Sequence, residues 1–595
     1  MNDRDIDREC SVCGELGATQ GGKCLKCIAA GIRPGVPPDD AAKVLSASGD
    51  DIAQQVLNRI AEERFIAAAQ ISATKSSGVP QPPDGPQPPD GPQSLGGSTP
   101  PADALRITSK LINDCLFAND LGDGTLYSIV FRDEFLFCKN TEKWFQWGGH
   151  FWKRDIMGRS LAAVEKVVAH YLSEYKRASS ELTDQVAAGL DPESPAAKKI
   201  RKHQGQLLKR VSQLRADPRR TACLKFAHTI ADPIAIEGEE FDCKPMLFPC
   251  ANGVIDLETG RLKPGRPGDY LSLASPAEFK GIDEPSPLWD KSLLEIFGGN
   301  WQLVAYLQRL LGYAISGQVN EKVFPVFYGR TGWNGRSLII ETISYVMGAL
   351  AGSIPAEMLL SQKYAKSSSG PSPDIMSLKG IRMAFASEID EGQRFSASKI
   401  KWLTGKDEMV GRNPHDKYQT RFAPTHKLFL MTNTLPQAPA NDKSFWERLH
   451  VIPFLISFVN RDPKETYERR AILDLDKQMI KEASGILSWL VSGCLLWQRD
   501  GLCPPPEVIE EGRKYQRDED LLTDFIDECC TREPGAREKA AALYARFVEW
   551  YHLNHGKKEW TGTTFGKQLA QKFDKTKSSG CVVYHGIMLT DNQGQ

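Results

Sequence analysis

Short runs of apolar residues in the second half of the chain predict buried strands. The runs are Val323–Tyr328, Gly380–Glu388, Lys427–Asn433 and Val451–Phe454. Apolar runs of this length are typical of strands that are covered on both faces. A glycine-rich turn follows the first run, and a helical pattern, Ser337–Ile343, follows the turn. This part of the chain is therefore predicted to be α/β.

Other regions show helical periodicity, and one shows none. Asp39–Ala69, Ser160–Ala231 and Leu288–Ser316 are helical in pattern. Val79–Ala102 contains the tandem repeat PQPPDGPQPPDGPQ. Such a proline-rich repeat cannot pack a core and forms an extended linker. The clearest predicted domain boundary lies in this linker.

The length of the chain, 595 residues, is too great for a single hydrophobic core. We predict a multidomain protein. Its predicted parts are a cysteine-containing module (1–35), a helical segment (36–78), a Pro-rich linker (79–106), an α+β domain (107–285), a larger α/β domain (286–500) and a small C-terminal domain (501–595).

Composition and charge are those of an ordinary soluble protein, with 41% hydrophobic and 25% charged residues. No apolar run approaches the roughly 20 residues that span a membrane. The polar start, MNDRDIDREC, is not a signal peptide. We therefore expect a cytoplasmic protein without membrane contact. Because the net charge is −1, binding to nucleic acid has to be argued from local sequence.

Four cysteines near the N-terminus predict a zinc site. Cys10-x-x-Cys13 and Cys24-x-x-Cys27 form two pairs around a glycine-containing loop. Zn²⁺ takes four thiolates in a tetrahedron, and two such turns supply them. Unpaired cytosolic thiols are the alternative. A redox pair is disfavoured because no thioredoxin-like βαβ pattern surrounds either pair. We expect an N-terminal zinc ribbon in residues 1–35.

The turn after the first predicted strand has the parts of a phosphate-binding loop. The sequence FPVFYGRTGWNGRS, from Phe324 to Ser337, joins a strand, glycines, a basic residue, a hydroxyl and the start of a helix. Glycines let backbone N–H groups face phosphate oxygens, and a helix N-terminus adds a positive dipole end. In such loops the basic side chain reaches the outer phosphates and the hydroxyl holds Mg²⁺. ATP with Mg²⁺ is the predicted ligand.

The loop departs from the standard pattern at two positions. Arg336 stands where Lys is usual, and Arg330 stands where the first Gly is usual, between Gly329 and Gly332. Arg presents a wide planar fork in place of a compact charge. A wider loop accommodates that fork, which still donates paired hydrogen bonds to phosphate. A glycine turn without a ligand is the alternative.

Motifs downstream of the loop follow the order found in superfamily 3 helicases. The second predicted strand ends in Glu388, the third ends in Asn433, and Arg448 precedes the last. The phrases NGRS, ASEIDEG, KWLTGKDEMVGRNPHDKY, LFLMTN and FWERLHVIPF resemble the phage and plasmid primase-helicases related to the satellite-phage alpha protein and the poxvirus primase-helicase. The resemblance covers about Leu111 to Phe454.

This resemblance implies an AAA+-like superfamily 3 core and a role for each motif. Glu388, supported by Asp390, would hold Mg²⁺ through water and activate the attacking water, and Asn433 would sense the γ-phosphate. Family members assemble as hexamers with ATP between neighbours, so Arg448 would act in trans as an arginine finger. The loop residues that would bind ATP are Gly329, Gly332, Asn334, Gly335, Arg336 and Ser337.

Two basic segments are candidates for contact with DNA. Residues 198–220 carry nine Lys or Arg and one Asp, which suits either a solvated helix face or a contact with the DNA backbone. Residues 394–427 carry eight Lys or Arg against three acids and contain a turn-rich stretch. The resemblance implies that this stretch is a channel hairpin whose Arg412 and Lys417 grip DNA. An ordinary surface loop is the alternative.

Sequence on both sides of the helicase-like region resembles flanking domains of the same family. KWFQWGG at 143–149 and NGVIDLETG at 252–260 resemble signatures of the domain that precedes these helicases. After three prolines at 504–506, helical patterns and a wing-like β pattern fill 544–587. This tail resembles a winged helix, which places a helix in the DNA major groove. A purely structural cap is the alternative.

These observations predict an ATP-dependent, ring-forming DNA helicase that replicates a phage, plasmid or integrated element in the bacterial cytoplasm. We expect a homo-hexamer on single-stranded DNA and forks. Two alternatives stay open. Arg336 suggests a DNA-binding initiator with a weakened ATPase, and the family suggests a primase-helicase that makes primers. Residues 1–106 are too few for a polymerase-type domain, so a separate primase or polymerase is the expected partner.

Overall fold

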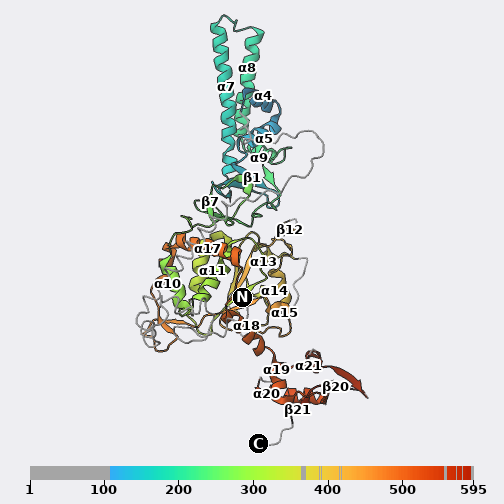
Figure 1. Cartoon of the computed structure of the whole chain (residues 1–595). Helices are drawn as coiled ribbons and strands as arrows, with labels where there is room; N and C mark the ends of the chain where they lie inside the picture. Colours follow the sequence, from blue (N-terminus) through green and yellow to red (C-terminus); the bar gives the residue numbers. More distant parts are fainter. Residues whose placement is uncertain are drawn as a thin grey trace, which may run out of the picture. The chain divides into compact units, whose positions relative to one another are not determined.

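The computed structural model describes residues 107–590 except 363–369, 388, 390–391, 415, 417–418, 555–558, 571 and 579 (Figure 1). The chain divides into two compact units, Met1–Arg106 and Ile107–Gln595. The first unit lies outside the described residues. The predicted zinc ribbon, with Cys10, Cys13, Cys24 and Cys27, lies there too, as do the predicted segments 36–78 and 79–106.

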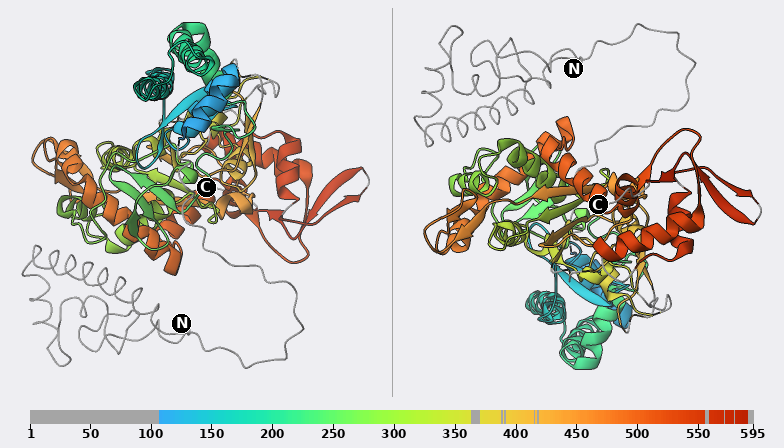
Figure 2. Two further views of the ribbon diagram at one scale, coloured as in Figure 1. Left: turned by 90° about the horizontal axis from the view of Figure 1, so that it is seen from above. Right: turned by 90° about the horizontal axis from the view of Figure 1, so that it is seen from below.

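Helices make up the beginning of the second unit. The two longest, α7 (Val164–Ala187) and α8 (Pro195–Leu214), lie side by side when seen along their axes (Figure 2). Ser194 caps α8 by accepting a hydrogen bond from the backbone N of Ala197, and Pro195 suits the first helical turn. Shorter helices pack around this pair: α4 (Ser109–Phe117), α5 (Asn119–Val130), α6 (Arg159–Ala162) and α9 (Asp217–Ala227).

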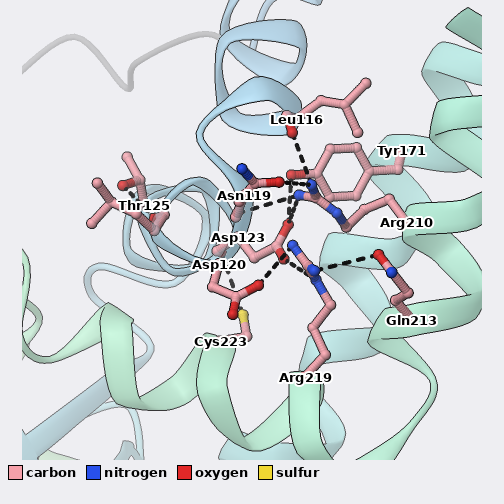
Figure 3. A network of polar contacts seen from close by, with 11 residues as sticks. Leu116, Asn119, Asp120, Asp123, Thr125, Tyr171, Arg210, Gln213, Arg219 and Cys223 are labelled. Atoms are coloured by element: carbon pink, nitrogen blue, oxygen red, sulfur yellow. Dashed lines mark hydrogen bonds and ion pairs between the residues drawn. The ribbon is translucent and has the colours of Figure 1, made fainter.

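A buried ion network joins four of these helices (Figure 3). The carboxylate of Asp123, on α5, is fully buried and accepts from Arg210 Nη1 at 2.7 Å and Arg219 Nε at 2.8 Å. The hydroxyl of Tyr171 donates to the same carboxylate at 2.9 Å, and Arg219 also pairs with Asp120 at 2.8 Å. The network thus fixes α5, α7, α8 and α9 relative to one another.

Two small sheets accompany the helices. The first has the strand order β3-β2-β1-β4, and its β2–β3 hairpin contains the KWFQWGG motif, with Trp147 paired to Trp152. The second, β5-β6-β7, contains NGVIDLETG. There Nδ2 of Asn252 donates to the carbonyl of Phe279, and Oδ1 accepts from the backbone N of Phe279, both at 2.9 Å. The strands are β1 (Phe135–Cys138), β2 (Lys143–Trp147), β3 (Trp152–Arg154), β4 (Ala235–Ile236), β5 (Leu247–Cys250), β6 (Gly253–Asp256) and β7 (Arg261–Lys263).

A five-stranded parallel sheet forms the centre of the predicted helicase region. Its order is β14-β8-β13-β10-β9. Side chains alternate between its faces: Leu428 and Leu430 enter one hydrophobic core, and Phe429 enters the other. The strands are β8 (Phe324–Tyr328), β9 (Ala351–Ser353), β10 (Met383–Ser387), β13 (Lys427–Thr432) and β14 (Leu449–Pro453).

Helices cover both faces of this sheet. One core contains side chains of α10 (Pro287–Ile296), α11 (Trp301–Ile315), α12 (Arg336–Met347), α16 (Leu475–Lys481) and α17 (Ala483–Asp500). The other contains side chains of α14 (Ala397–Leu403), α15 (Lys443–Trp446) and α18 (Pro506–Asp518). Further short elements are α13 (Pro373–Met376), β15 (Ser457–Val459), β16 (Glu468–Arg470), η1 (Pro267–Asp269), η2 (Gly348–Leu350) and η3 (Ala356–Met358).

The last described segment has an aromatic core of its own. Phe525, Phe547, Trp550, Phe565 and Tyr584 are buried together. The elements are α19 (Leu521–Cys529), β17 (Cys530–Thr531), β18 (Arg537–Lys539), α20 (Ala540–Asn554), α21 (Gly562–Leu569), β19 (Lys575–Ser578), β20 (Cys581–His585) and β21 (Met588–Leu589). Strands β19 and β20 form an antiparallel hairpin, as the wing-like sequence pattern predicts.

Over the described ranges, no single helix is long and apolar enough to cross a membrane. The pair α16 and α17 passes the length and composition criteria together, with a bend of 74° between them.

Candidate functional site

The predicted motifs follow strands whose carboxyl ends lie at the same end of the parallel sheet. Tyr328 at the end of β8 is level with Thr432 on β13, and Met431 on β13 is level with Ser387 on β10. Because the strands are parallel, the segments that follow them leave at the same edge. The loop after Tyr328 and Asn433 after β13 therefore start side by side, next to the end of β10. Glu388 and Asp390 themselves lie outside the described residues.

Two of the loop glycines are required by the local geometry. A Cβ on Gly329 would lie 2.1 Å from Nδ2 of Asn334. Gly335 has a φ of 85°, and a Cβ there would lie 2.6 Å from Ile296. Any other residue would therefore force the loop to move. Gly332, by contrast, has open space around it.

Hydrogen bonds within the loop and from the neighbouring strand β15 hold the loop in place. Asn334 is buried, and its Nδ2 donates to the carbonyl of Thr331 at 2.7 Å. The backbone N of Phe458 donates to the carbonyl of Trp333 at 2.7 Å. Trp333 itself has a φ of 58° and a side chain that is 78% exposed.

Arg336 is turned into the protein, which differs from the phosphate contact expected from the sequence. Its side chain is 9% exposed. Nε donates to Oδ1 of Asn334 at 2.9 Å and Nη1 to the carbonyl of Phe327 at 3.2 Å. Nη1 also donates to the carbonyl of Thr432, and Nη2 to Oδ1 of Asn433. Burial lowers the pKa of this guanidinium, and its hydrogen-bond acceptors are all neutral oxygens.

The remaining predicted ATP-site residues are open. Ser337 is exposed on the first turn of α12, and Asn433 is exposed at the end of β13. The free N–H groups of that first helical turn make it favourable for an anion. Arg336 links the start of α12 to the end of β13, because it is the first residue of α12 and its side chain donates a hydrogen bond to Asn433.

Arg448 lies at the amino end of the strands, opposite to the end where the glycine-rich loop begins. It directly precedes β14, and its carbonyl accepts from the backbone N of Phe324, the first residue of β8. The loop follows the last residue of β8, which is about 13 Å away at roughly 3.3 Å per residue. The Nη1 of Arg448 donates to the carbonyl of Ser444 at 2.5 Å, and its Nε is buried without a partner among the described residues. This side chain therefore cannot reach the loop of its own chain.

A cavity of about 400 Å³ lies beside the loop. Apolar walls come from Ile296, Phe297 and Ile456 among others, and Glu507, Glu510 and Glu511 line it as well. Asn300, also in the lining, donates from Nδ2 to Oε1 of Glu507 at 2.7 Å. Ile296, which lines the cavity, also lies close to Gly335 of the loop.

The turn-rich basic stretch is a hairpin. Strands β11 (Met409–Gly411) and β12 (Thr420–Phe422) are antiparallel. Arg412 follows β11 and donates from Nη1 to the carbonyl of Asp416 at 3.3 Å. Lys417 lies outside the described residues. Lys427, the last lysine of this basic stretch, is buried and donates to the carbonyl of Ser316, so it lies inside the protein and not on a surface that could contact DNA.

The other basic segment is largely structural. Arg210 and Arg219 belong to the ion network around Asp123, and Arg215 pairs with Glu165. On α8, Lys198 and Arg201 pair with Glu193 at the surface, and Lys199, Lys202 and Lys209 are also exposed. Four of the five arginines of this segment thus pair with carboxylates of the protein.

A comparison with protein families matches residues 126–298 to the family described as D5 N terminal like. This part of the chain is thus similar to that family. "Putative helicase L207/L206" of Acanthamoeba polyphaga mimivirus is 27% identical over 428 residues, which are 69% of this chain and 43% of the viral protein. "Putative helicase 022R" of Frog virus 3 is 22% identical over 392 residues, which are 54% of this chain and 40% of that protein. The resemblance to primase-helicases is thus confirmed.

The chain spans less than half of the length of either viral relative. A solved structure, "The A form apo structure of NrS-1 C terminal region-CTR", matches with a TM-score of 0.39 at 11% identity, over 78% of this chain and 99% of that one. Within the described residues, no group of three or more His, Cys, Asp or Glu side chains is placed to hold a metal ion.

Sequence reasoning missed two polar contacts of this site. One is the bond from Arg336 to Asn433, and the other is a bond from Arg330 Nε to the hydroxyl of Tyr328 at 3.1 Å. The only signal in the sequence was that both arginines break the usual loop pattern.

Proposed function

We propose that this protein is an ATP-dependent helicase whose residues 286–500 form an AAA+-like superfamily 3 motor. The observation that supports the proposal most strongly is the shared edge of β8, β10 and β13. There the glycine-rich loop and Asn433 lie next to one another, and β10, the strand that precedes Glu388 in the sequence, ends beside them. These are the groups that phosphoryl transfer needs, because its catalysis is positioning plus electrostatic stabilisation.

In this proposal the triphosphate lies against the loop and the first turn of α12, and the base enters the adjacent cavity. Ser337 and, through water, Glu388 with Asp390 would hold Mg²⁺, which neutralises charge on the phosphates. Asn433 would contact the γ-phosphate. Arg448 would serve the site of a neighbouring subunit, which agrees with its place at the far edge of the sheet.

DNA binding is proposed for two elements. The β11–β12 hairpin, with Arg412 and Lys417, would contact the backbone of single-stranded DNA in the channel of a homo-hexameric ring. The C-terminal elements from α19 to β21 would act as a winged helix, since the β19–β20 hairpin follows α20 and α21. The N-terminal cysteines would bind Zn²⁺.

The test is DNA-stimulated ATP hydrolysis and displacement of a strand from a forked duplex by the purified full-length protein. Both activities are expected in the wild type. Asn433→Ala should lower turnover at least tenfold without loss of DNA binding, because Asn433 lies at the loop and far from the hairpin. Wild-type protein that neither hydrolyses ATP nor separates strands would contradict the proposal.

The inward position of Arg336 favours a second candidate, an initiator that binds DNA and has a weakened ATPase. Its prediction is distinct: DNA binding with intact affinity and little or no strand displacement. The same two assays therefore separate the two candidates.

A further inference from the structure

We propose that Arg330 is the phosphate-binding cation of the loop, and that Arg336 is a positioning residue that fixes Asn334 and Asn433. The inference rests on the proposed nucleotide site, and it reverses the roles that the standard loop pattern suggests. In that pattern the basic residue just before the hydroxyl contacts phosphate, and here that residue is Arg336.

The bonds of Arg336 leave it little capacity for a ligand. A guanidinium has five N–H groups, and four of them are directed at the oxygens of Asn334, Phe327, Thr432 and Asn433. To reach a phosphate, the side chain would have to leave the buried carbonyls of Phe327 and Thr432 without a donor, which is unfavourable. Arg336 therefore stays where it is and holds the loop against the ends of β8 and β13.

Arg330 has the opposite surroundings. It is exposed in the loop, directly after Gly329. Among the residues that the structure describes, only the hydroxyl of Tyr328 bonds this side chain, by accepting from Nε at 3.1 Å, and that contact raises the pKa of the guanidinium. Its two Nη groups remain available for a ligand, and a guanidinium fork binds phosphate through two parallel hydrogen bonds.

The anchor of Arg330 is itself fixed. Tyr328 ends β8 and is paired with Thr432 on one side and Pro453 on the other. An arginine held at Nε by a residue of the sheet has fewer orientations than a free side chain. The cost of ordering it when a ligand binds is correspondingly smaller.

The experiment measures binding of Mg-ATP, Mg-ADP and AMP to the full-length protein by titration calorimetry. Arg330→Ala should weaken ATP binding at least tenfold, ADP binding less, and AMP binding hardly at all. Arg330→Lys should recover part of the loss. Tyr328→Phe removes only the anchoring hydroxyl and should weaken ATP binding about threefold. Arg154→Ala, at an exposed arginine on β3 in a different sheet, is the matched control and should bind like the wild type.

Arg336→Lys is the variant that tests the positioning role. Its affinity for ATP should stay within about threefold of wild type, while turnover and the melting temperature both fall, since lysine cannot bond all four acceptors. Loss of ATP affinity in a folded Arg336→Lys protein, or wild-type affinity in Arg330→Ala, would overturn the assignment. If wild-type protein binds no nucleotide, the proposed function falls as well, so the two failures are distinguishable.

Discussion

The side chain of Asp123 is fully buried and forms ion pairs with two arginines, so these pairs are expected to contribute to stability (Figure 3). Asp123→Asn would leave Arg210 buried without a counter-charge, while Arg219 would keep only its pair with Asp120. Breaking a buried pair in this way costs about 3–5 kcal/mol. We expect a loss of that size in the free energy of unfolding of the helical region, measured by urea denaturation with circular dichroism.

A matched control exists in the same region. Asp232 pairs with Arg132 at 2.7 Å, but the two side chains are 83% and 44% exposed. Asp232→Asn should cost less than about 1 kcal/mol, because exposed pairs contribute little. Equal losses in the two variants would show that burial of the Asp123 network adds nothing.

His426 predicts a loss of stability in mild acid. Burial lowers its pKa to about 4, and its ring bonds the carbonyl of Leu403 at 3.1 Å. The unfolded chain takes up a proton near pH 6.5, but the folded protein does so only near pH 4. Stability is therefore intact above pH 6.5 and falls as the pH drops toward 4, by about 2 kcal/mol between pH 6.5 and 5.

His426→Gln should flatten this dependence in part, since burial also lowers the pKa of His450 to about 4. The measurement is the urea midpoint at a series of pH values from 7.5 to 4.5. Parallel curves for variant and wild type would contradict the prediction.

At the level of elements, we expect the β11–β12 hairpin to contact DNA. A protein with both Arg412→Ala and Lys417→Ala should bind single-stranded DNA more weakly at every sequence. The slope of log affinity against log salt should shrink by roughly 1.4, because two contacts with phosphates of a single strand are lost. Fluorescence anisotropy at several salt concentrations measures both quantities.

The paired control is Lys199→Ala with Lys202→Ala on α8, which removes the same charge from an exposed helix face. This variant should keep the affinity and salt slope of the wild type. If the control lost binding and the hairpin variant did not, α8 would be the DNA contact.

Most strands of the central sheet could be predicted from the sequence, because apolar runs such as Lys427–Asn433 are nearly uninterrupted. The direction of Arg336 could not. Sequence places it before a hydroxyl at a helix start, but its orientation depends on carbonyls of Phe327 and Thr432, which only the strand pairing brings together. The basic segment 198–220 shows the same limit, since Asp123, the partner of Arg210, is 87 residues away in sequence.

At the level of the whole molecule, the site is expected to need two chains. Arg448→Ala should lower turnover about 10³-fold if it acts as an arginine finger. A protein mixed from Arg448→Ala and Asn433→Ala chains should recover activity, because some interfaces then combine an intact Asn433 with an intact Arg448. A mixture no more active than its two components would show that both residues act within one chain.

Zinc content tests the N-terminal module. Metal analysis of the purified protein should give about one Zn²⁺ per chain, since four thiolates close one structural site. Cys24→Ser with Cys27→Ser should remove it and unfold the module, because metal binding supplies its folding energy. ATPase activity should persist. Full zinc retention in this variant would exclude the site.

The bonds between Arg336, Asn334 and Asn433 also limit how this loop can evolve. A single change to lysine at 336 would leave the side-chain oxygens of Asn334 and Asn433 and two backbone carbonyls without this donor. A change at either asparagine would leave the guanidinium without one of its acceptors. Each single step is therefore unfavourable. We expect these three positions to vary together among descendants of this sequence, so that lineages keep either the arginine with both asparagines or lysine with a different pair.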